Sequence, residues 1–136
     1  MDNDLFEKGL EMRKSVLGAD YVYMGTRFIP SHECLAADDY KQMVVDASAG
    51  DIVTSDSVTG VKANWLKNSL LNAGYDLKNM PPAGDINFLE AAGDVKRWRD
   101  IWAAGQAVGS ITQQQSIKDI VDQLEQEYLS VKGVES

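Results

Sequence analysis

One nearly continuous apolar run constrains the fold of this chain more than any other feature. Residues 19–25 (ADYVYMG) are rich in aromatic and β-branched side chains, and the sequence turns polar after Gly25. Such a run is typical of a buried strand that opens into a loop. An isolated buried strand leaves two unpaired edges. Any fold that contains this strand must therefore supply neighbours for it.

Helical patterns fill most of the remaining sequence. Apolar residues recur three and four positions apart in four segments, which predicts helices over residues 4–17, 36–47, 61–73 and 117–128. Asp94 can cap another helix, in which Val95, Trp98, Ile101 and Trp102 share one face. Residues 51–54 fit a short strand. The patterns together predict a helix-rich α/β fold.

Glycine, proline and hydroxyl residues mark where these elements end. Gly74 supplies a left-handed stop after the third helix, and residues 79–84 (NMPPAG) form a loop within one unit. Residues 105–109 form a glycine-bracketed turn, and Thr112 or Ser116 can cap the last helix. The helices can pack around five large side chains, namely Trp65, Trp98, Trp102, Ile120 and Leu124.

Charge and cysteine content exclude several classes of function. The chain has 13 basic and 21 acidic residues, a net charge of -8, and its sequence pI is about 4.5. This field repels nucleic acid and anionic membranes. A single cysteine, Cys34, and a single histidine, His32, provide neither an internal disulfide nor a zinc site. With no transmembrane run and an acidic start, we expect a cytoplasmic protein without a metal.

The end of the apolar run is the strongest candidate for ligand binding. Gly25 lets the backbone approach a ligand closely, the Thr26 hydroxyl can donate to phosphate oxygens, and Arg27 can add a positive charge. Gly105 and Gln106 can hold a loop against a flat ligand. The pattern at Gly25 and Thr26 also fits an ordinary turn, and the glycines at 105 and 109 also fit simple helix caps. For each segment, the ligand-binding and the structural interpretation both stay open.

No residue pattern identifies a catalytic group. His32 has no second histidine and no paired carboxylates at a suitable spacing, which favours a loop position. Cys34 has no cationic context that would activate its thiol. Trp98 and Trp102, four residues apart, fit a core better than a stacking platform. The catalytic residues therefore stay unknown.

From about Gly18 onward the sequence resembles the C-terminal portion of the nitronate monooxygenases, formerly called 2-nitropropane dioxygenases. The matching stretches, in order, are GAD (18–20), YMGTRF (23–28), EC (33–34), YKQ (40–42), TG (59–60), NWL (64–66), INF (86–88) and WRDIWAAGQAVG (98–109). The resemblance implies an FMN enzyme on a TIM barrel with an added, mainly helical domain. That enzyme oxidises alkyl nitronates with dioxygen.

The resemblance also implies a division of roles along the chain. Residues 1–35 would form an N-terminal helix and the last barrel strand with its phosphate turn, and residues 36–136 the mainly helical region. Met24, Gly25 and Thr26 would form the strand-eight half of the flavin phosphate site, since TIM barrels bind phosphate at the loops after strands seven and eight. Gly105 and Gln106 resemble the family's glycine-rich segment near the flavin. Only the last barrel strand is present in this sequence, so we expect no catalysis by this chain alone.

Two further hypotheses remain open. The first 18 residues resemble the N-terminal helix of the carboxymuconolactone decarboxylase family, which is compatible with a chimeric reading frame, with a decarboxylase-like protein or with a divergent barrel helix. Alternatively, the chain is a non-catalytic helical module that buries its apolar strand by self-association or against a partner chain.

Overall fold

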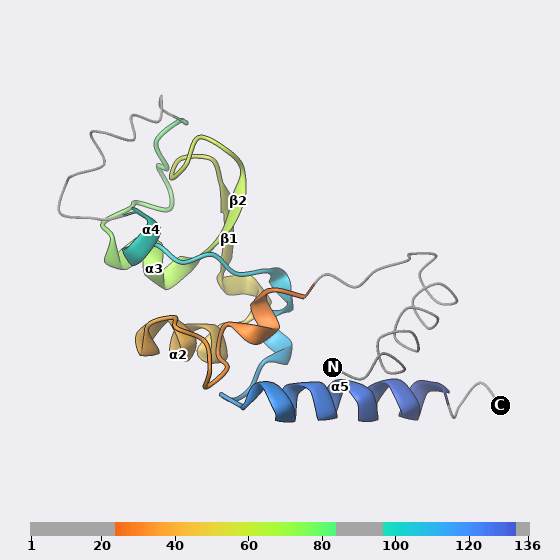
Figure 1. Ribbon diagram of the computed structural model, residues 1–136. Coiled ribbons are helices and arrows are strands. Elements are labelled where there is room, and N and C mark those ends of the chain that lie inside the picture. Colours follow the sequence, from red (N-terminus) through yellow and green to blue (C-terminus); the bar gives the residue numbers. More distant parts are fainter. Residues whose placement is uncertain (1–23, 84–96, 133–136) are drawn as a thin grey trace.

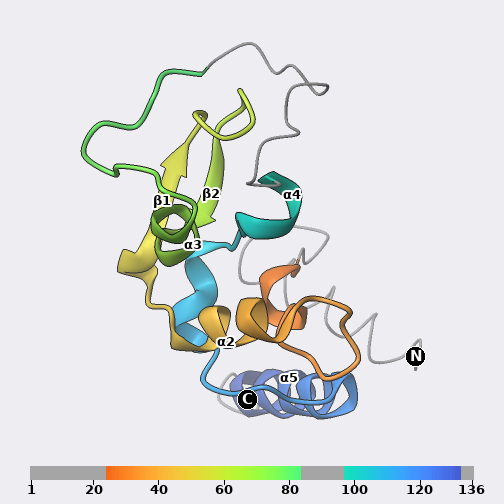
Figure 2. The same cartoon turned by 90° about the vertical axis from the view of Figure 1, so that its left-hand side faces the viewer.

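The computed structural model describes residues 24–83 and 97–132. In chain order its elements, with η denoting a 3-10 helix, are η1 (Thr26–Phe28), α2 (Asp38–Asp46), η2 (Ala49–Asp51), β1 (Ile52–Ser55), β2 (Ala63–Leu66), α3 (Lys67–Asn72), α4 (Arg97–Asp100), η3 (Gln106–Ser110) and α5 (Ile117–Lys132). Figure 1 and Figure 2, two views turned by 90°, both show β1, β2, α3 and α4 at one end and α2 and α5 at the other, with η3 between them. The described part is helix-rich α/β, as the sequence predicts.

The strands form an antiparallel pair in which Thr54 lies opposite Asn64 and Val53 opposite Trp65. The helix expected over residues 61–73 is therefore wrong in its first half, because residues 63–66 are β2 and the helix begins at Lys67. The other edge of β2 is also paired: the Leu66 N–H donates to the Trp102 carbonyl at 2.8 Å. Pairing on both edges outweighs the local helical periodicity of this segment.

The side chains of Trp65 and Leu66 point to opposite faces of β2, as those of successive strand residues do, and each is buried in a different cluster. Leu66 belongs to a cluster that we call the α2 cluster, with Val44, Ala104, Val108 and Ile111. Trp65 belongs to the α3 cluster, with Val58, Leu70 and Ile101. Of the five side chains expected to form the packing, Trp102 packs against the α2 cluster and Trp65 lies in the α3 cluster, while Ile120 is also buried.

Two helix ends confirm their sequence signals. After α3, Gly74 has φ of 85°, its N–H donates to Leu71, and the Tyr75 N–H donates to Leu70. This is the bonding pattern of a Schellman stop, which requires the left-handed conformation that glycine adopts freely. At the start of α5, the Ser116 hydroxyl accepts a hydrogen bond from the Asp119 N–H, so Ser116 is the cap.

The region around α4 differs from the sequence expectation. The helix ends at Asp100, and Trp102 lies beyond it in an extended segment whose next residue, Ala103, forms an antiparallel bridge with Trp65. Ile101 is nevertheless buried, as its place in the helical pattern suggested. Because β2 offers an unpaired edge, residues 102–104 gain hydrogen bonds there that another helical turn would not provide.

Several predictions concern residues outside the described part of the chain. These are the helix over 4–17, the strand residues 19–23 and the cap at Asp94. Within the described end of that run, Met24 is not in a strand and Thr26–Phe28 form η1. The division at residue 35 stays a prediction, although the region after it contains two strands as well as helices. In the described residues, no helix has the length and apolarity needed to cross a membrane.

Candidate functional site

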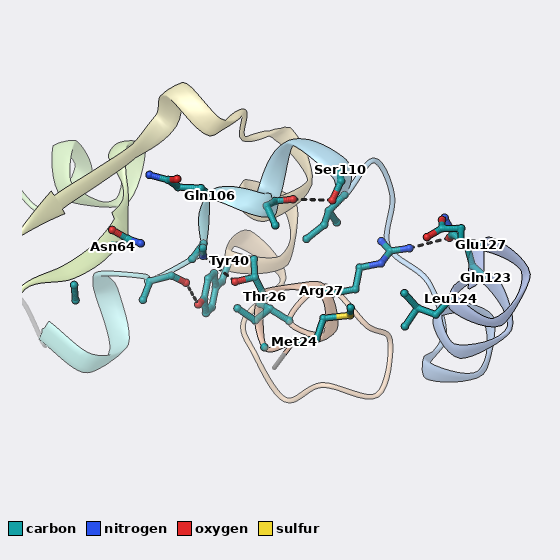
Figure 3. Close-up of a pocket in the computed structure, with 18 residues that line it drawn as sticks. Met24, Thr26, Arg27, Tyr40, Asn64, Gln106, Ser110, Gln123, Leu124 and Glu127 are labelled. Carbon is teal, nitrogen blue, oxygen red and sulfur yellow. Dashed lines mark hydrogen bonds between the residues drawn. The ribbon is translucent and has the colours of Figure 1, made fainter. Parts of the chain in front are cut away.

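A pocket of about 790 Å³ lies among η1, η3, β2 and α5. All five residues predicted from the sequence to bind a cofactor line it: Met24, Gly25, Thr26, Gly105 and Gln106. The volume falls within the range of roughly 300–1,000 Å³ that is typical of ligand pockets. Figure 3 shows the lining side chains, which come from segments far apart in the sequence.

One hydrogen bond joins the two predicted segments. The backbone N–H of Gly105 donates to the Thr26 hydroxyl oxygen at 2.8 Å, across 79 residues of sequence. Because Thr26 accepts this bond, its own hydroxyl proton remains able to donate to a ligand. A Cβ on Gly105 would lie 3.2 Å from that oxygen, so glycine makes room for this close approach. The structure thus places the two glycine segments side by side.

Gly25 contributes space rather than an unusual backbone conformation. Its φ of -90° is open to any residue, and the Phe28 N–H donates to its carbonyl to close the turn of η1. A Cβ added at Gly25 would meet no atom of the described residues within 4 Å. Within the described part of the chain, the space beside this lining residue is therefore open.

Arg27 lies in the lining, where its guanidinium is held by neutral groups. It donates to the side-chain oxygens of Gln115 at 3.0 Å and Gln123 at 2.8 Å. Figure 3 shows it directed toward α5. Among the described residues no carboxylate forms an ion pair with Arg27, while the Gln123 amide donates to Glu127 at 2.7 Å. The Glu127 carboxylate also lines the pocket, so Arg27 offers a hydrogen-bonding guanidinium to an anion beside a negative charge.

Tyr40 and Asn64 are among the lining residues that the sequence analysis does not single out as site residues. Tyr40 stacks on Trp102 with ring centroids 5.1 Å apart, and its hydroxyl donates to the Ala103 carbonyl. The Asn64 side-chain oxygen accepts a hydrogen bond from the Thr54 hydroxyl at 2.7 Å. Local pattern gave only a helical position for each residue, so no local signal marked either as part of a site.

The ionisation of the Tyr40 hydroxyl provides a test of how buried this residue is. Burial raises the pKa of Tyr40 above its ordinary 10.0, and the charge of Cys34 adds to this effect. Above pH 10 the unfolded chain therefore loses a phenol proton that the folded chain keeps, and stability falls as the pH rises. We expect the ultraviolet titration of wild type minus Tyr40→Phe to be centred above pH 10. A difference curve centred at or below pH 10 would contradict this.

The remaining candidates of the sequence lie elsewhere. His32 is exposed on the loop after η1, where its backbone N–H donates to the Gln115 carbonyl at 3.0 Å. Cys34 is partly buried and has no disulfide partner. Neither residue lines the pocket. In the described ranges, no group of three or more His, Cys, Asp and Glu side chains is arranged to hold a metal ion.

Comparisons with known proteins give consistent matches. The family model described as "Nitronate monooxygenase" matches residues 14–127. A curated relative, "Probable nitronate monooxygenase" of Bacillus subtilis, is 25% identical over 123 residues, covering 85% of this chain and 35% of the relative. The family match begins within the segment that resembles the carboxymuconolactone decarboxylase helix, and residues 1–13 lie outside it.

Solved structures match over a similar length. FabK from Thermotoga maritima has a TM-score of 0.62 and 27% sequence identity, covering 89% of this chain and 41% of FabK. A point mutant of the same FabK gives a TM-score of 0.59 at 26% identity, covering 89% and 38%. This chain therefore spans about 35–41% of the length of the relatives that it matches.

Proposed function

Because this chain belongs to the nitronate monooxygenase family, we propose that its pocket holds FMN, with Met24, Gly25 and Thr26 at the phosphate and Gly105 and Gln106 near the flavin ring. The family is FMN-dependent, and this chain matches part of each of the TIM-barrel enzymes found in the structure comparison. The observation that carries the proposal is the bond between Gly105 and Thr26, which joins both candidate segments in one pocket.

The residues of the pocket suit a flavin phosphate. Thr26 can donate its hydroxyl proton, Gly25 leaves open space at the lining, and Arg27 brings a positive charge that forms no ion pair with a described carboxylate. Hydrogen bonds from these donors to a doubly charged phosphate are stronger than bonds between neutral groups. We assign phosphate binding to this turn and a position near the flavin to Gly105 and Gln106.

The proposed reaction of the complete enzyme is the oxidation of alkyl nitronates with dioxygen. Bound flavin supplies the electron-transfer chemistry, and the protein supplies binding and orientation. The chain spans 35% of its curated relative, and we assign none of its residues to the proton-transfer step. We therefore propose that turnover needs further barrel segments, and that this chain supplies the part of the phosphate site formed by Met24, Gly25 and Thr26.

Gly25→Ala tests the assignment. No atom of the described residues lies within 4 Å of the added methyl group, which we expect to occupy the opening where the phosphate is proposed to bind. We expect wild type to bind FMN more tightly than riboflavin, and Gly25→Ala to weaken FMN by roughly 10- to 100-fold, the range for lost hydrogen bonds to a charged group. Flavin fluorescence titration measures both affinities, and riboflavin affinity should hardly change.

Gly50→Ala is the matched control. It makes the same substitution at an exposed glycine in η2, where the new Cβ would lie 3.7 Å from the Ser48 oxygen and outside the pocket lining. We expect wild-type affinity for both flavins. Equal binding of FMN and riboflavin by wild type, or an unchanged FMN affinity in Gly25→Ala, would refute the proposed phosphate site.

A further inference from the structure

Asn64 presents an oriented hydrogen-bond donor at the pocket. It lies on β2 directly opposite Thr54, and the Thr54 hydroxyl donates to its side-chain oxygen at 2.7 Å. In this arrangement the amide oxygen faces the Thr54 hydroxyl and the amide nitrogen is directed away from it. In the described part of the chain, no group accepts a hydrogen bond from the Asn64 Nδ2, and the residue lines the pocket while half-buried. The amide nitrogen therefore has donors to offer a ligand.

Tyr40 lines the same pocket as Asn64. Figure 3 shows the Tyr40 ring between Thr26 and Asn64. One face of the ring stacks on Trp102 with an interplanar angle of 13°, and the hydroxyl is bonded to Ala103, so the ring is held in place from two sides. A rigid aromatic ring at a pocket wall suits a flat aromatic ligand, because ring contacts add to the burial of apolar area.

The two ends of the pocket differ in chemistry. In Figure 3, Arg27 and the Glu127 carboxylate lie toward one end, Asn64 lies toward the other, and Thr26 and the Tyr40 ring lie between them. A ligand whose anionic group binds beside Thr26 extends its remaining part toward Tyr40 and Asn64. Asn64 can then satisfy a carbonyl oxygen on that part of the ligand.

We propose that Asn64 is a specificity-determining residue of the pocket, whose side-chain Nδ2 donates a hydrogen bond to the carbonyl-bearing edge of the flavin ring. This rests on the proposed function in that the ligand is a flavin. Thr54 is a positioning residue: it holds the Asn64 oxygen and so directs the nitrogen toward the ring. The geometry selects ligands with an acceptor at this end, and it acts on the ring rather than on the phosphate.

Asn64→Asp reverses the relevant chemistry with little change of shape, because it replaces the donor by a second acceptor oxygen. We expect it to weaken FMN and riboflavin by the same factor of about 10 or more, the value of one lost hydrogen bond together with the repulsion between acceptors. Thr54→Val removes the orienting hydroxyl and should weaken both flavins by the same smaller factor. Fluorescence titration of the full chain measures all four affinities.

Asn68→Asp is the control for charge. It makes the same substitution at an exposed position on α3, outside the pocket lining, and we expect wild-type affinity for both flavins. Wild-type affinity in Asn64→Asp would overturn the assignment of a donor to Asn64. If Asn64→Asp does not fold, Thr54→Val decides alone: unchanged affinity for both flavins in this variant would overturn the positioning by Thr54 and with it the proposal.

The two flavins separate this proposal from the phosphate site. If wild type binds both flavins equally and Asn64→Asp weakens both, the phosphate assignment fails and the role of Asn64 is supported. If wild type favours FMN and Asn64→Asp changes neither affinity, the phosphate assignment survives and the role of Asn64 is overturned. If wild type binds neither flavin, both are overturned.

Discussion

Trp65→Ala is expected to lower the free energy of unfolding by about 3–5 kcal/mol, the usual cost of removing a large aromatic side chain from a core. Trp65 is 4% exposed and belongs to the α3 cluster with Val58, Leu70 and Ile101. Its indole N–H donates to the Ser55 carbonyl at 3.1 Å, which ties β2 to β1. The substitution leaves a cavity that these neighbours can fill only in part.

Chemical denaturation followed by circular dichroism measures this loss. Trp65→Phe serves as the control, because it keeps an aromatic ring in the cluster and removes the indole hydrogen bond. We expect Trp65→Phe to retain most of the stability that Trp65→Ala loses. A loss below about 1 kcal/mol in Trp65→Ala, which is typical of surface positions, would show that the α3 cluster is not a core of the folded protein.

Leu66→Ala is expected to lower the free energy of unfolding by about 2–5 kcal/mol, since it truncates a side chain buried on the face of β2 opposite to Trp65. Leu66 is 1% exposed and contacts the α2 cluster, two of whose members, Ala104 and Ile111, also line the pocket. The substitution therefore weakens the wall of the pocket together with the core. Loss of flavin affinity should accompany the loss of stability.

Leu71→Ala is the matched control for this variant. Leu71 lies on the adjoining helix α3 but is 47% exposed, so we expect its truncation to cost within about 0.5 kcal/mol of zero. Both variants are compared by chemical denaturation under the same conditions. Similar losses in Leu66→Ala and Leu71→Ala would contradict the burial difference on which the prediction depends.

The sequence predicted the elements whose signals are local. The helix over 36–47 is confirmed as α2, the strand over 51–54 as β1, and the last helix as α5 with Ser116 as its cap. Gly74 ends α3 as expected because a left-handed residue was needed there. These signals depend on a few neighbouring residues and on no distant contact.

Residues 63–66 show where local signals fail. Their apolar spacing fits a helix, yet they form β2 because β1 and residues 102–104 pair with its two edges. These partners lie about 10 and 40 residues away, and periodicity within a short window contains no information about them. Trp102 was assigned to a helix for the same reason.

The candidate site divides in the same way. The glycine and threonine of residues 25–26 and the pair 105–106 stood out by residue type and by resemblance, and all four line the pocket. The tertiary structure brings the two segments together, as the hydrogen bond from Gly105 to Thr26 shows. Tyr40 and Asn64 had no local mark, since their roles arise from the stack on Trp102 and the bond from Thr54.

By itself, the sequence determined the family, the helix-rich α/β class and the residue types of the turn at residues 24–26, because these depend on composition, spacing and order along the chain. Only the tertiary structure decided that β2 is a strand, that Trp65 and Leu66 serve two separate clusters, and that Asn64 lies in the pocket. The reason is that strand pairing and pocket lining are set by contacts between segments tens of residues apart, whose free energy exceeds local preference.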